Sequence, residues 1–525
     1  MTAAGYGMQL TEKGIADRSL WEAKAYGLPS FDREAVEKAT RAAPFWIHFG
    51  AGNIFRAFQA NIVQELLNEK VLDRGLVLAG IHDYETIEKM YRPHDNLSIL
   101  VTLKGDGTVK KTVIASIMES LVADRKAEAD WSRLCDIFRS PSLQMVSFTI
   151  TEKGYALDDV SAEEPAKPES SMGKIAALLY ERYLAGALPL ALVSMDNCSH
   201  NGDRLFAAVN AFAEEWEKRG LCRKGFCAYV GDKAKVSFPW TMIDKITPRP
   251  DAKIAKILEA DGVEGLEPVI TAKKTYVAPF VNAEECQYLV IEDAFPNGRP
   301  ALEKAGIYFA DRATVGKVEK MKVCTCLNPL HTFLALAGCL LGYTLIADEM
   351  KDPDLLCLVK RLGYDEGLPV VVDPGIISPR DFIDEVVNIR IPNPFMPDTP
   401  QRIACDTSQK LPIRFGETIK GYMKRADLDV TKLRVLPLTF ALWLRYLMAV
   451  DDAGKAFELS PDPLLETVRA AVPGAIAQLL HRADIFGVDL YEAGLAGRVS
   501  DYFARLSAGT GAVRKLLKDV CREIA

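Results

Sequence analysis

The sequence predicts an α/β protein in which a doubly wound, mostly parallel sheet domain precedes a mostly α-helical domain. Strand-like and helix-like segments alternate from residue 44 to about residue 311, the pattern of a sheet covered on both faces. From residue 312 onward the segments are almost all helical. We therefore expect an N-terminal extension over residues 1–43, the sheet domain over 44–311 and the helical domain over 312–525. A chain of 525 residues is also too long for one ordinary core.

Short apolar runs mark the predicted strands of the sheet domain. They cover residues 44–49, 76–81, 145–151 and 188–194. Residues 53–72 should form a helix, because apolar side chains recur there at four-residue intervals, namely Ile54, Phe58, Ile62 and Leu66. A second helix is expected over residues 205–218, before Gly220, with one apolar face made of Phe206, Val209, Phe212 and Trp216.

Helical segments dominate the C-terminal part. They are expected at residues 327–343, 353–362, 380–387, 412–425, 437–450, 463–471, 473–480 and 490–506. The one strand-like run is 370–372. The most apolar stretch, 333–346, is shorter than the ~18 residues that a membrane span needs. It contains glycine and threonine. We therefore expect a buried helix and no membrane partner.

Composition narrows the class of protein further. A net charge of −7 provides no electrostatic footprint for nucleic acid, although a local basic pocket for a small anion is compatible with it. The N-terminus lacks a basic segment followed by an apolar run, so no signal peptide is expected. The 11 cysteines are scattered and odd in number, which fits reduced thiols in a cytoplasm. Cys324 and Cys326 lack the spacing and companion ligands of a zinc site, so no metal is expected.

A glycine-rich turn follows the first predicted strand. Gly50 and Gly52 stand where this strand leads into the predicted helix, and glycine there lets backbone N–H groups approach a pyrophosphate. Phe55 occupies the place of the usual third glycine. A turn of this kind alone also occurs as a plain strand–helix connection.

Asp83 adds a second indication of a dinucleotide. It follows the second predicted strand, where a carboxylate can accept hydrogen bonds from a ribose diol, although an exposed loop aspartate is the plainer reading. A carboxylate there repels a 2′-phosphate, and no arginine follows before Arg92, so NAD is favoured over NADP. Arg56 could still meet a phosphate. The residues expected to hold the cofactor are Gly50, Gly52, Asn53, Ile54, Arg56 and Asp83.

Four polar residues could carry out a metal-free alcohol oxidation. This reaction needs a base for the hydroxyl proton and donors for the developing alkoxide. A lysine can be that base where burial lowers its pKa, and asparagine amides are neutral donors. Lys322, Asn328 and His331 lie close together around the start of the predicted helix 327–343. Asn197 follows the predicted strand 188–194, where an open α/β sheet presents its ligands.

Several ordered segments resemble the polyol-specific long-chain dehydrogenases, the family of mannitol 2-dehydrogenase and fructuronate reductase (mannonate oxidoreductase). The nucleotide turn, His-Phe-Gly-Ala-Gly-Asn-Ile-Phe-Arg, resembles the family's opening motif, and the Asp-Asn pair followed by Asn-Gly resembles another. The matching segments are residues 48–56, 151–155, 196–202, 238–248, 291–300 and 393–410. The resemblance implies a Rossmann-type domain followed by a mostly helical domain, with the site in the cleft between them.

The resemblance also implies roles for the polar residues. Lys322 would be the general base, Asn197 and Asn328 would form the oxyanion hole, and His331 would hold the substrate. Further candidates would bind the substrate's hydroxyls or carboxylate or relay a proton, namely Arg402, Lys410, Asp244 and Glu319. Five residues separate Lys322 from Asn328, where the family usually has four. Either a local bulge absorbs the extra residue, or Lys322 points elsewhere.

Each of these assignments has a structural alternative. Lys322 could be a solvated helix-end charge, and His331 a core residue. Arg402 and Lys410 could lie on a surface helix. Asp244 could cap the turn before Pro248. His48, inside a strand, is expected to be a packing residue.

The predicted activity is a reversible hydride transfer between NAD and a sugar-derived secondary alcohol. The favoured pair is mannonate and fructuronate, mainly because residues 327–331, Leu-Asn-Pro-Leu-His, resemble those of relatives assigned as mannonate oxidoreductases. Arg402 and Lys410 could also neutralise a carboxylate, although neutral sugars could use the same donors. Mannitol and fructose, or another polyol or altronate, are the alternatives. A nucleotide-binding or methyl-transfer protein, or an NAD-binding sensor without catalysis, is the alternative of another class. The oligomeric state is left open.

Overall fold

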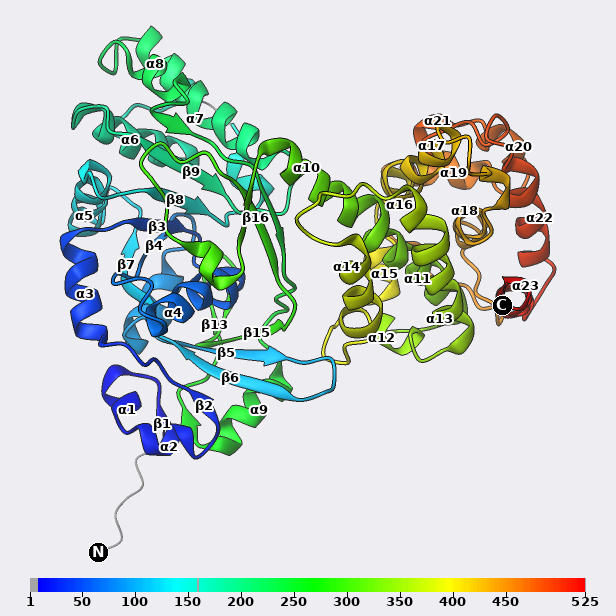
Figure 1. The fold of residues 1–525 in the computed structure, drawn as a ribbon, viewed down its shortest axis with the longest axis horizontal. Helices are drawn as coiled ribbons and strands as arrows, with labels where there is room; N and C mark the ends of the chain where they lie inside the picture. The colour runs from blue at the N-terminus through cyan, green and yellow to red at the C-terminus, as the bar shows by residue number, and fades with distance from the viewer. Residues whose placement is uncertain (1–7, 158–159, 525) are drawn as a thin grey trace, which may run out of the picture. The chain divides into compact units, whose positions relative to one another are not determined.

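Six parallel strands form the central sheet of the N-terminal half. The computed structural model describes residues 8–157 and 160–524 (Figure 1). The sheet has the order β7-β4-β3-β8-β9-β10. The strands are β3 Trp46–Phe49, β4 Leu76–Gly80, β7 Ile117–Val122, β8 Met145–Phe148, β9 Leu190–Ser194 and β10 Val236–Ser237. Numbered along the chain this order is 3-2-1-4-5-6, that of a Rossmann-type domain, with the reversal between β3 and β8.

Both faces of this sheet are buried, as the doubly wound prediction requires. Successive residues of one strand enter different cores: Val146 and Phe148 of β8 pack in one, and Met145 packs in the other. The helices around the sheet are α4 Ala60–Asn68, α5 Glu128–Arg139, α6 Ser171–Leu184, α7 Asn201–Lys218 and α8 Phe226–Gly231. Residues of α5 to α8 belong to the first core and those of α4 to the second. Alternate side chains of a strand thus point to opposite faces of the sheet, and each face is covered by its own set of helices.

Two of the predicted helices differ from expectation in detail. The helix expected over 53–72 contains a π-helical turn, η1 Phe55–Gln59, before α4. Helix α7 begins at Asn201, four residues before the predicted start, because the Asn201 side chain is bonded into the fold. The prediction that Phe206 lies on its buried face is wrong, since Phe206 is 37% exposed. The buried stripe instead runs through Leu205, Val209, Phe212 and Trp216.

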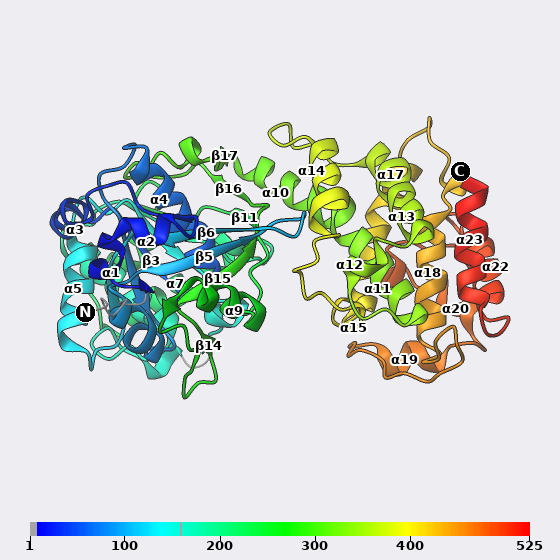
Figure 2. The same cartoon turned by 90° about the horizontal axis from the view of Figure 1, so that it is seen from below.

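Smaller sheets surround the parallel sheet. One has the order β15-β5-β6-β2 and includes the antiparallel pair β5 Ser98–Leu103 and β6 Val109–Ile114 (Figure 2). Its other members are β15 Phe280–Glu284 and β2 Tyr26–Gly27. A second has the order β11-β16-β17, with β11 Thr241–Asp244, β16 Tyr288–Glu292 and β17 Tyr308–Ala310. A hairpin joins β13 Val269–Ile270 to β14 Tyr276–Val277.

The described part of residues 1–43 folds onto these elements. It contains α1 Glu12–Ala16, α2 Arg18–Glu22 and α3 Arg33–Ala42. Strand β1, Met8–Gln9, pairs with β12, Val263–Glu264, and β2 pairs with β6. Residues 1–7 of the predicted extension lie outside the described residues.

The chain divides into two compact units. Unit 1 comprises Met1–Leu103 and Thr108–Val315, and unit 2 comprises Lys104–Gly107 and Gly316–Ala525. Over its described residues, unit 2 is built from helices. Its longer helices are α11 Asn328–Leu341, α13 Pro353–Lys360, α14 Pro379–Glu385, α17 Glu417–Met423, α18 Val435–Tyr446, α22 Ala496–Leu506 and α23 Ala512–Ile524. Its shorter ones are α12 Ile346–Glu349, α15 Pro400–Ile403, α16 Thr407–Leu411, α19 Leu465–Ala470, α20 Ile476–Leu479 and α21 Ala483–Phe486.

Two apolar helices form the core of unit 2. Every residue of α18 is buried, and α11, which packs against it, is buried from Thr332 to Leu340. Helices α18, α22 and α23 lie side by side (Figure 2). The segment Arg312–Leu341 is long and apolar enough to cross a membrane, but 78% of its most apolar window is buried inside the fold, as in the core helix of a soluble protein. The strand-like run 370–372 is not a strand: a helical turn, Leu368–Val370, precedes extended backbone that has no neighbouring strand.

Candidate active site

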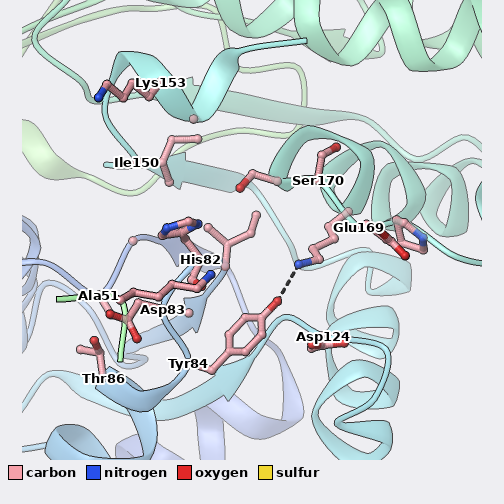
Figure 3. Close-up of a pocket in the computed structure, with 18 of the residues that line it drawn as sticks. Ala51, His82, Asp83, Tyr84, Thr86, Asp124, Ile150, Lys153, Glu169 and Ser170 are labelled. Atoms are coloured by element: carbon pink, nitrogen blue, oxygen red, sulfur yellow. Dashed lines mark hydrogen bonds between the residues drawn. The ribbon is translucent and has the colours of Figure 1, made fainter. Parts of the chain in front are cut away.

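A cavity of about 1030 Å³ opens at the carboxyl ends of β3, β4 and β8 (Figure 3). It lies where the strand order reverses, the position at which open α/β sheets bind ligands. The loops that follow these strands supply its lining, including Gly50–Gly52, Gly80–Tyr84 and Thr149–Thr151. Six basic and three acidic side chains line it, so an anionic ligand suits it. The basic residues are Arg125, Lys126, Lys153, Lys167, Lys174 and Lys273, and the acidic ones are Asp83, Asp124 and Glu169.

The two glycines of the turn, Gly50 and Gly52, lack a side chain for different structural reasons. Gly50 has φ +129°, and a Cβ there would lie 2.3 Å from the carbonyl oxygen of Thr149, so the fold itself requires glycine. A Cβ at Gly52 would have no protein atom within 4 Å. Because Gly52 lines the cavity, the absence of its side chain leaves room for a ligand rather than for packing. A backbone cradle of this kind fits a pyrophosphate.

Asp83 stands at the expected place beside the cavity (Figure 3). Its Oδ2 accepts a hydrogen bond from Thr271 Oγ1 at 2.5 Å. Lys273 Nζ, on the turn of the β13–β14 hairpin, donates to the carbonyl oxygen of His82 at 2.6 Å. This hairpin therefore holds the loop that carries the carboxylate. The sequence reasoning identified Asp83 but not Thr271 or Lys273, which lie about 190 residues further along the chain.

Tyr84 and Lys174 form a polar pair on the wall of the cavity. The Tyr84 hydroxyl accepts a hydrogen bond from Lys174 Nζ at 2.6 Å (Figure 3). Burial lowers the pKa of Lys174, and the charge of Asp124 opposes that shift. Burial also raises the pKa of Tyr84 to about 12, so the phenol stays neutral in the physiological range.

Three residues of the predicted cofactor set do not line this cavity. Arg56 is fully buried, and its Nη1 donates to the carbonyl oxygen of Ala278 at 2.7 Å and to Ser98 Oγ at 3.2 Å. Its Nη2 donates to Asn53 Oδ1 at 3.0 Å. Arg56 thus braces the start of the helix from inside the core, which corrects the expectation of a phosphate contact. Asn53 and Ile54 lie in the first turn of that helix, and Asn53 serves as the partner of Arg56.

Asp196 organises the loop that follows β8. Its carboxylate accepts hydrogen bonds from the N–H groups of Ile150, at 3.1 Å, and Thr151, at 2.8 Å. The Tyr155 hydroxyl donates to it at 2.5 Å. Burial raises the pKa of Asp196, and these three hydrogen bonds oppose the shift.

The loop held by Asp196 contains a strained residue. Thr151 has φ 64° and ψ 163°, a conformation that costs a non-glycine residue about 1–3 kcal/mol. Thr151 lines the cavity, so Asp196 holds a strained residue where a ligand would bind. The sequence motifs contain both residues, but spacing alone did not indicate this contact.

The other predicted residues of unit 1 lie after β9 and on β11. Asn197 is exposed directly after the buried Asp196. Asn201 is buried, and its amide donates to Thr241 Oγ1 at 2.8 Å, which ties the start of α7 to β11. Asp244 is buried at the end of β11, where it pairs in register with Tyr288 of β16. His48 is a packing residue, as expected: its ring is hydrogen-bonded to the hydroxyls of Ser147 on β8 and of Thr149 just after it, and stacks on Phe55.

Lys322 begins a π-helical turn in unit 2. It is only 5% exposed, and the turn, η7, runs Lys322–Cys326 between α10, Arg312–Met321, and α11. The N–H of Leu327 donates to the carbonyl oxygen of Lys322 at 3.1 Å, a bond across five residues instead of four. Of the two alternatives for the extra residue before Asn328, the local bulge is therefore present.

Asn328 and His331 lie one turn apart at the start of α11, and both are partly accessible. Arg414, on the π-helical turn η11 Pro412–Gly416, contacts the same turn of α11. Its Nη1 donates to Thr332 Oγ1 at 2.6 Å and to the carbonyl oxygen of Asn328 at 3.5 Å. Burial lowers the pKa of Arg414 to about 10. Sequence analysis missed Arg414, which follows Lys410 by four residues.

Arg402, Lys410 and Glu319 differ in their surroundings. Arg402 on α15 is exposed and paired with Asp398. Lys410 is half-buried, and its Nζ donates to the carbonyl oxygens of Ile403 and Cys405. Burial lowers the pKa of Lys410, and the neighbouring Arg414 charge lowers it further. Glu319 is partly buried on α10. The structure thus places Lys322, Asn328, His331 and Lys410 in unit 2, and Asn197 and Asp244 in unit 1.

Cys324 and Cys326 are shielded thiols. Burial raises the pKa of Cys324 to about 11 and that of Cys326 to about 12. Within residues 8–157 and 160–524, no group of three or more histidine, cysteine or acidic side chains could hold a metal ion.

Comparison with known proteins identifies the family. The model of the mannitol dehydrogenase Rossmann domain matches residues 45–304, and that of the mannitol dehydrogenase C-terminal domain matches residues 314–506. The chain belongs to the mannitol dehydrogenase family. It is 52% identical to D-mannonate oxidoreductase of Thermotoga maritima, over 98% of this chain and 99% of that one. The structure of Pseudomonas fluorescens mannitol 2-dehydrogenase with NAD and D-mannitol matches with TM-score 0.70 and 26% identity, over 98% of this chain and all of that one.

A second relative shows how far the resemblance extends. D-mannonate oxidoreductase of Escherichia coli is 29% identical over 91% of this chain and 95% of its own. The fold and the family predicted from the sequence are therefore confirmed. The cavity of unit 1 also fits a dinucleotide, because Gly52 leaves its cradle open and Asp83 stands beside it.

Proposed function

We propose that this protein is an NAD-dependent D-mannonate oxidoreductase that interconverts D-mannonate and D-fructuronate. The observation that carries the proposal is the 52% identity to a D-mannonate oxidoreductase over nearly the whole of both chains. The cavity of unit 1 supports the cofactor, because its basic lining suits a pyrophosphate and Asp83 suits a ribose diol. A carboxylate at that position disfavours the 2′-phosphate of NADP.

The proposed mechanism uses side chains of this chain for every proton step. Lys322 takes the proton of the secondary hydroxyl, and the amide of Asn328 donates a hydrogen bond to the oxygen that becomes negative. Asn197 is the second proposed donor, and His331 orients the substrate. The cavity lined by Gly52 and Asp83 would hold NAD, which would supply the hydride acceptor. Since Lys322 is buried, little water competes for the proton that it receives.

Absorbance at the NADH band tests this proposal. Purified protein is mixed with NAD and D-mannonate, D-mannitol, D-altronate or D-arabinitol, and with NADH and the corresponding ketones. We expect turnover with D-mannonate and D-fructuronate to exceed that with the neutral polyols. If only D-mannitol is turned over, the substrate is a neutral polyol and not a sugar acid. NAD binding with no turnover of any of these compounds would indicate a sensor. We place the enzyme in the cytoplasm, where its 11 cysteines would stay reduced.

A further inference from the structure

Arg414 is a partly buried cation without an acidic partner. Nη1 bonds to the Thr332 hydroxyl and the Asn328 carbonyl, both neutral groups. Among the described residues, no carboxylate lies within ion-pair distance of its guanidinium. Burying a charge without an opposite charge is costly, and the lowered pKa of Arg414 reflects that cost. A negatively charged ligand bound to Arg414 would offset this energetic cost.

The free donors of Arg414 remain accessible to a ligand. Nε and Nη2 make no hydrogen bond within the described chain, and neither is sealed from solvent. Two arginines that are buried behave differently. Arg182 directs all three guanidinium nitrogens at backbone carbonyls, and so does Arg445. Arg182 and Arg445 therefore stabilise the fold with all their nitrogens, whereas Nε and Nη2 of Arg414 are available to a ligand.

The surroundings of Arg414 belong to the candidate active site. Its charge acts on Cys324 in the turn η7 that begins with Lys322, and η11 packs against η7. Lys410, one helical turn before Arg414, lies close enough for the two positive charges to lower the pKa of the lysine. Two cations therefore stand beside the segment that carries Lys322, Asn328 and His331. A neutral polyol would leave the charge of Arg414 uncompensated, whereas a carboxylate would neutralise it through charge-assisted hydrogen bonds.

We propose that Arg414 binds the carboxylate of the sugar acid and so selects aldonates over neutral polyols. A planar guanidinium with two free donors matches a carboxylate in geometry as well as in charge. This inference rests on the proposed function, because it names the residue that recognises the acid group of that substrate. The residue is one that the sequence motifs did not indicate.

Comparison of D-mannonate with its neutral amide, D-mannonamide, tests the role of Arg414. The amide keeps every hydroxyl and loses only the charge. We expect wild-type kcat/KM to be at least 100-fold higher for the acid than for the amide. Arg414→Gln should reduce this ratio to below tenfold, mainly by raising KM for the acid, and should leave KM for NAD unchanged. Arg414→Lys should restore part of the ratio. Arg445→Gln is the matched control, because it removes a buried guanidinium bound to carbonyls, and its acid-to-amide ratio should stay that of the wild type.

Three results would overturn the inference. Equal losses on acid and amide in Arg414→Gln would indicate a structural role at the start of α11. An unchanged ratio would place the carboxylate elsewhere. Wild-type turnover of D-mannitol without turnover of D-mannonate would refute the proposed function itself, and the unmutated protein reveals this before any variant is compared. Thermal unfolding of each variant, together with NAD binding, separates loss of folding from loss of recognition.

Discussion

Replacing Glu349 by glutamine should remove a pH-dependent loss of stability from unit 2. Glu349 ends α12 and is 0% exposed. Within the described residues neither of its carboxyl oxygens has a hydrogen-bond partner. It packs against α11, where a Cβ at Gly338 would lie 2.2 Å from its Oε1. Burial raises the pKa of Glu349 from 4.5 to about 9, and the charge of Asp352 adds to the shift.

The sign and size of the effect follow from linkage. In the folded protein the carboxyl stays protonated up to about pH 9, whereas in the unfolded chain it ionises above about pH 4.5. Its contribution to stability is therefore complete below pH 4.5 and is lost as the pH rises towards 9. The loss is about 1.4 kcal/mol per pH unit, or about 4 kcal/mol between pH 5 and pH 8. Water that enters on ionisation reduces this figure, so we expect about 2–4 kcal/mol.

Thermal and urea unfolding at pH 5 and pH 8 measure the difference. Wild type should lose about 2–4 kcal/mol more than Glu349→Gln over this interval, because the amide does not ionise. Glu366, whose pKa burial raises to about 7, contributes its own pH dependence, but equally in both proteins. The matched control is Glu466→Gln on α19, which removes an exposed carboxyl and should follow wild type. If wild type and Glu349→Gln lose the same stability, then Glu349 is ionised in the folded protein and the reasoning fails.

Three further predictions concern the candidate site. Lys322→Ala should lower kcat by about 10²–10⁴-fold while NAD affinity is kept. Lys320→Ala, on the exposed side of α10, should leave kcat nearly unchanged. Equal kcat in the two variants would show that Lys322 is not the general base. Gly52→Val should raise KM for NAD at least about tenfold with little change in melting temperature. Gly50→Ala should instead destabilise the protein by about 1–3 kcal/mol. The reverse pattern would contradict the view that Gly52 leaves room for a ligand and that the fold requires Gly50. Asp83→Ser should cost about 1.5–3 kcal/mol in NAD binding and improve the relative use of NADP, and unchanged cofactor preference would speak against a ribose contact.

Local signals in the sequence were enough to predict the central sheet. Apolar runs of four to six residues are typical of strands buried on both faces, and their alternation with helices predicts a parallel sheet. The start of α7 was not predictable in this way. Asn201 is polar and breaks the apolar pattern, but its amide binds Thr241, 40 residues later, and so the helix starts there.

Long-range contacts likewise decide which candidate residues line the cavity. The residues that a strand end or a glycine turn brings to it, such as Gly52 and Asp83, follow from local pattern plus topology. Arg56 belongs to the same motif, yet its helix turns the guanidinium inward to a carbonyl 222 residues away. Arg414 shows the opposite case, since its importance depends on the absence of an acidic neighbour. An absent neighbour leaves no signal in a single sequence.

The π-helical turn at Lys322 accommodates the extra residue between Lys322 and Asn328. One extra residue in an α-helix would rotate Lys322 by about 100° relative to Asn328 and move it to another face. The Leu327 to Lys322 hydrogen bond places the extra residue in a single wide turn between α10 and α11. The turns η8, Arg361–Gly367, and η11 pack against η7, so the wide turn is supported by neighbours that are themselves π-helical. Lys322 and Arg414 therefore both stand on π-helical turns that pack against each other.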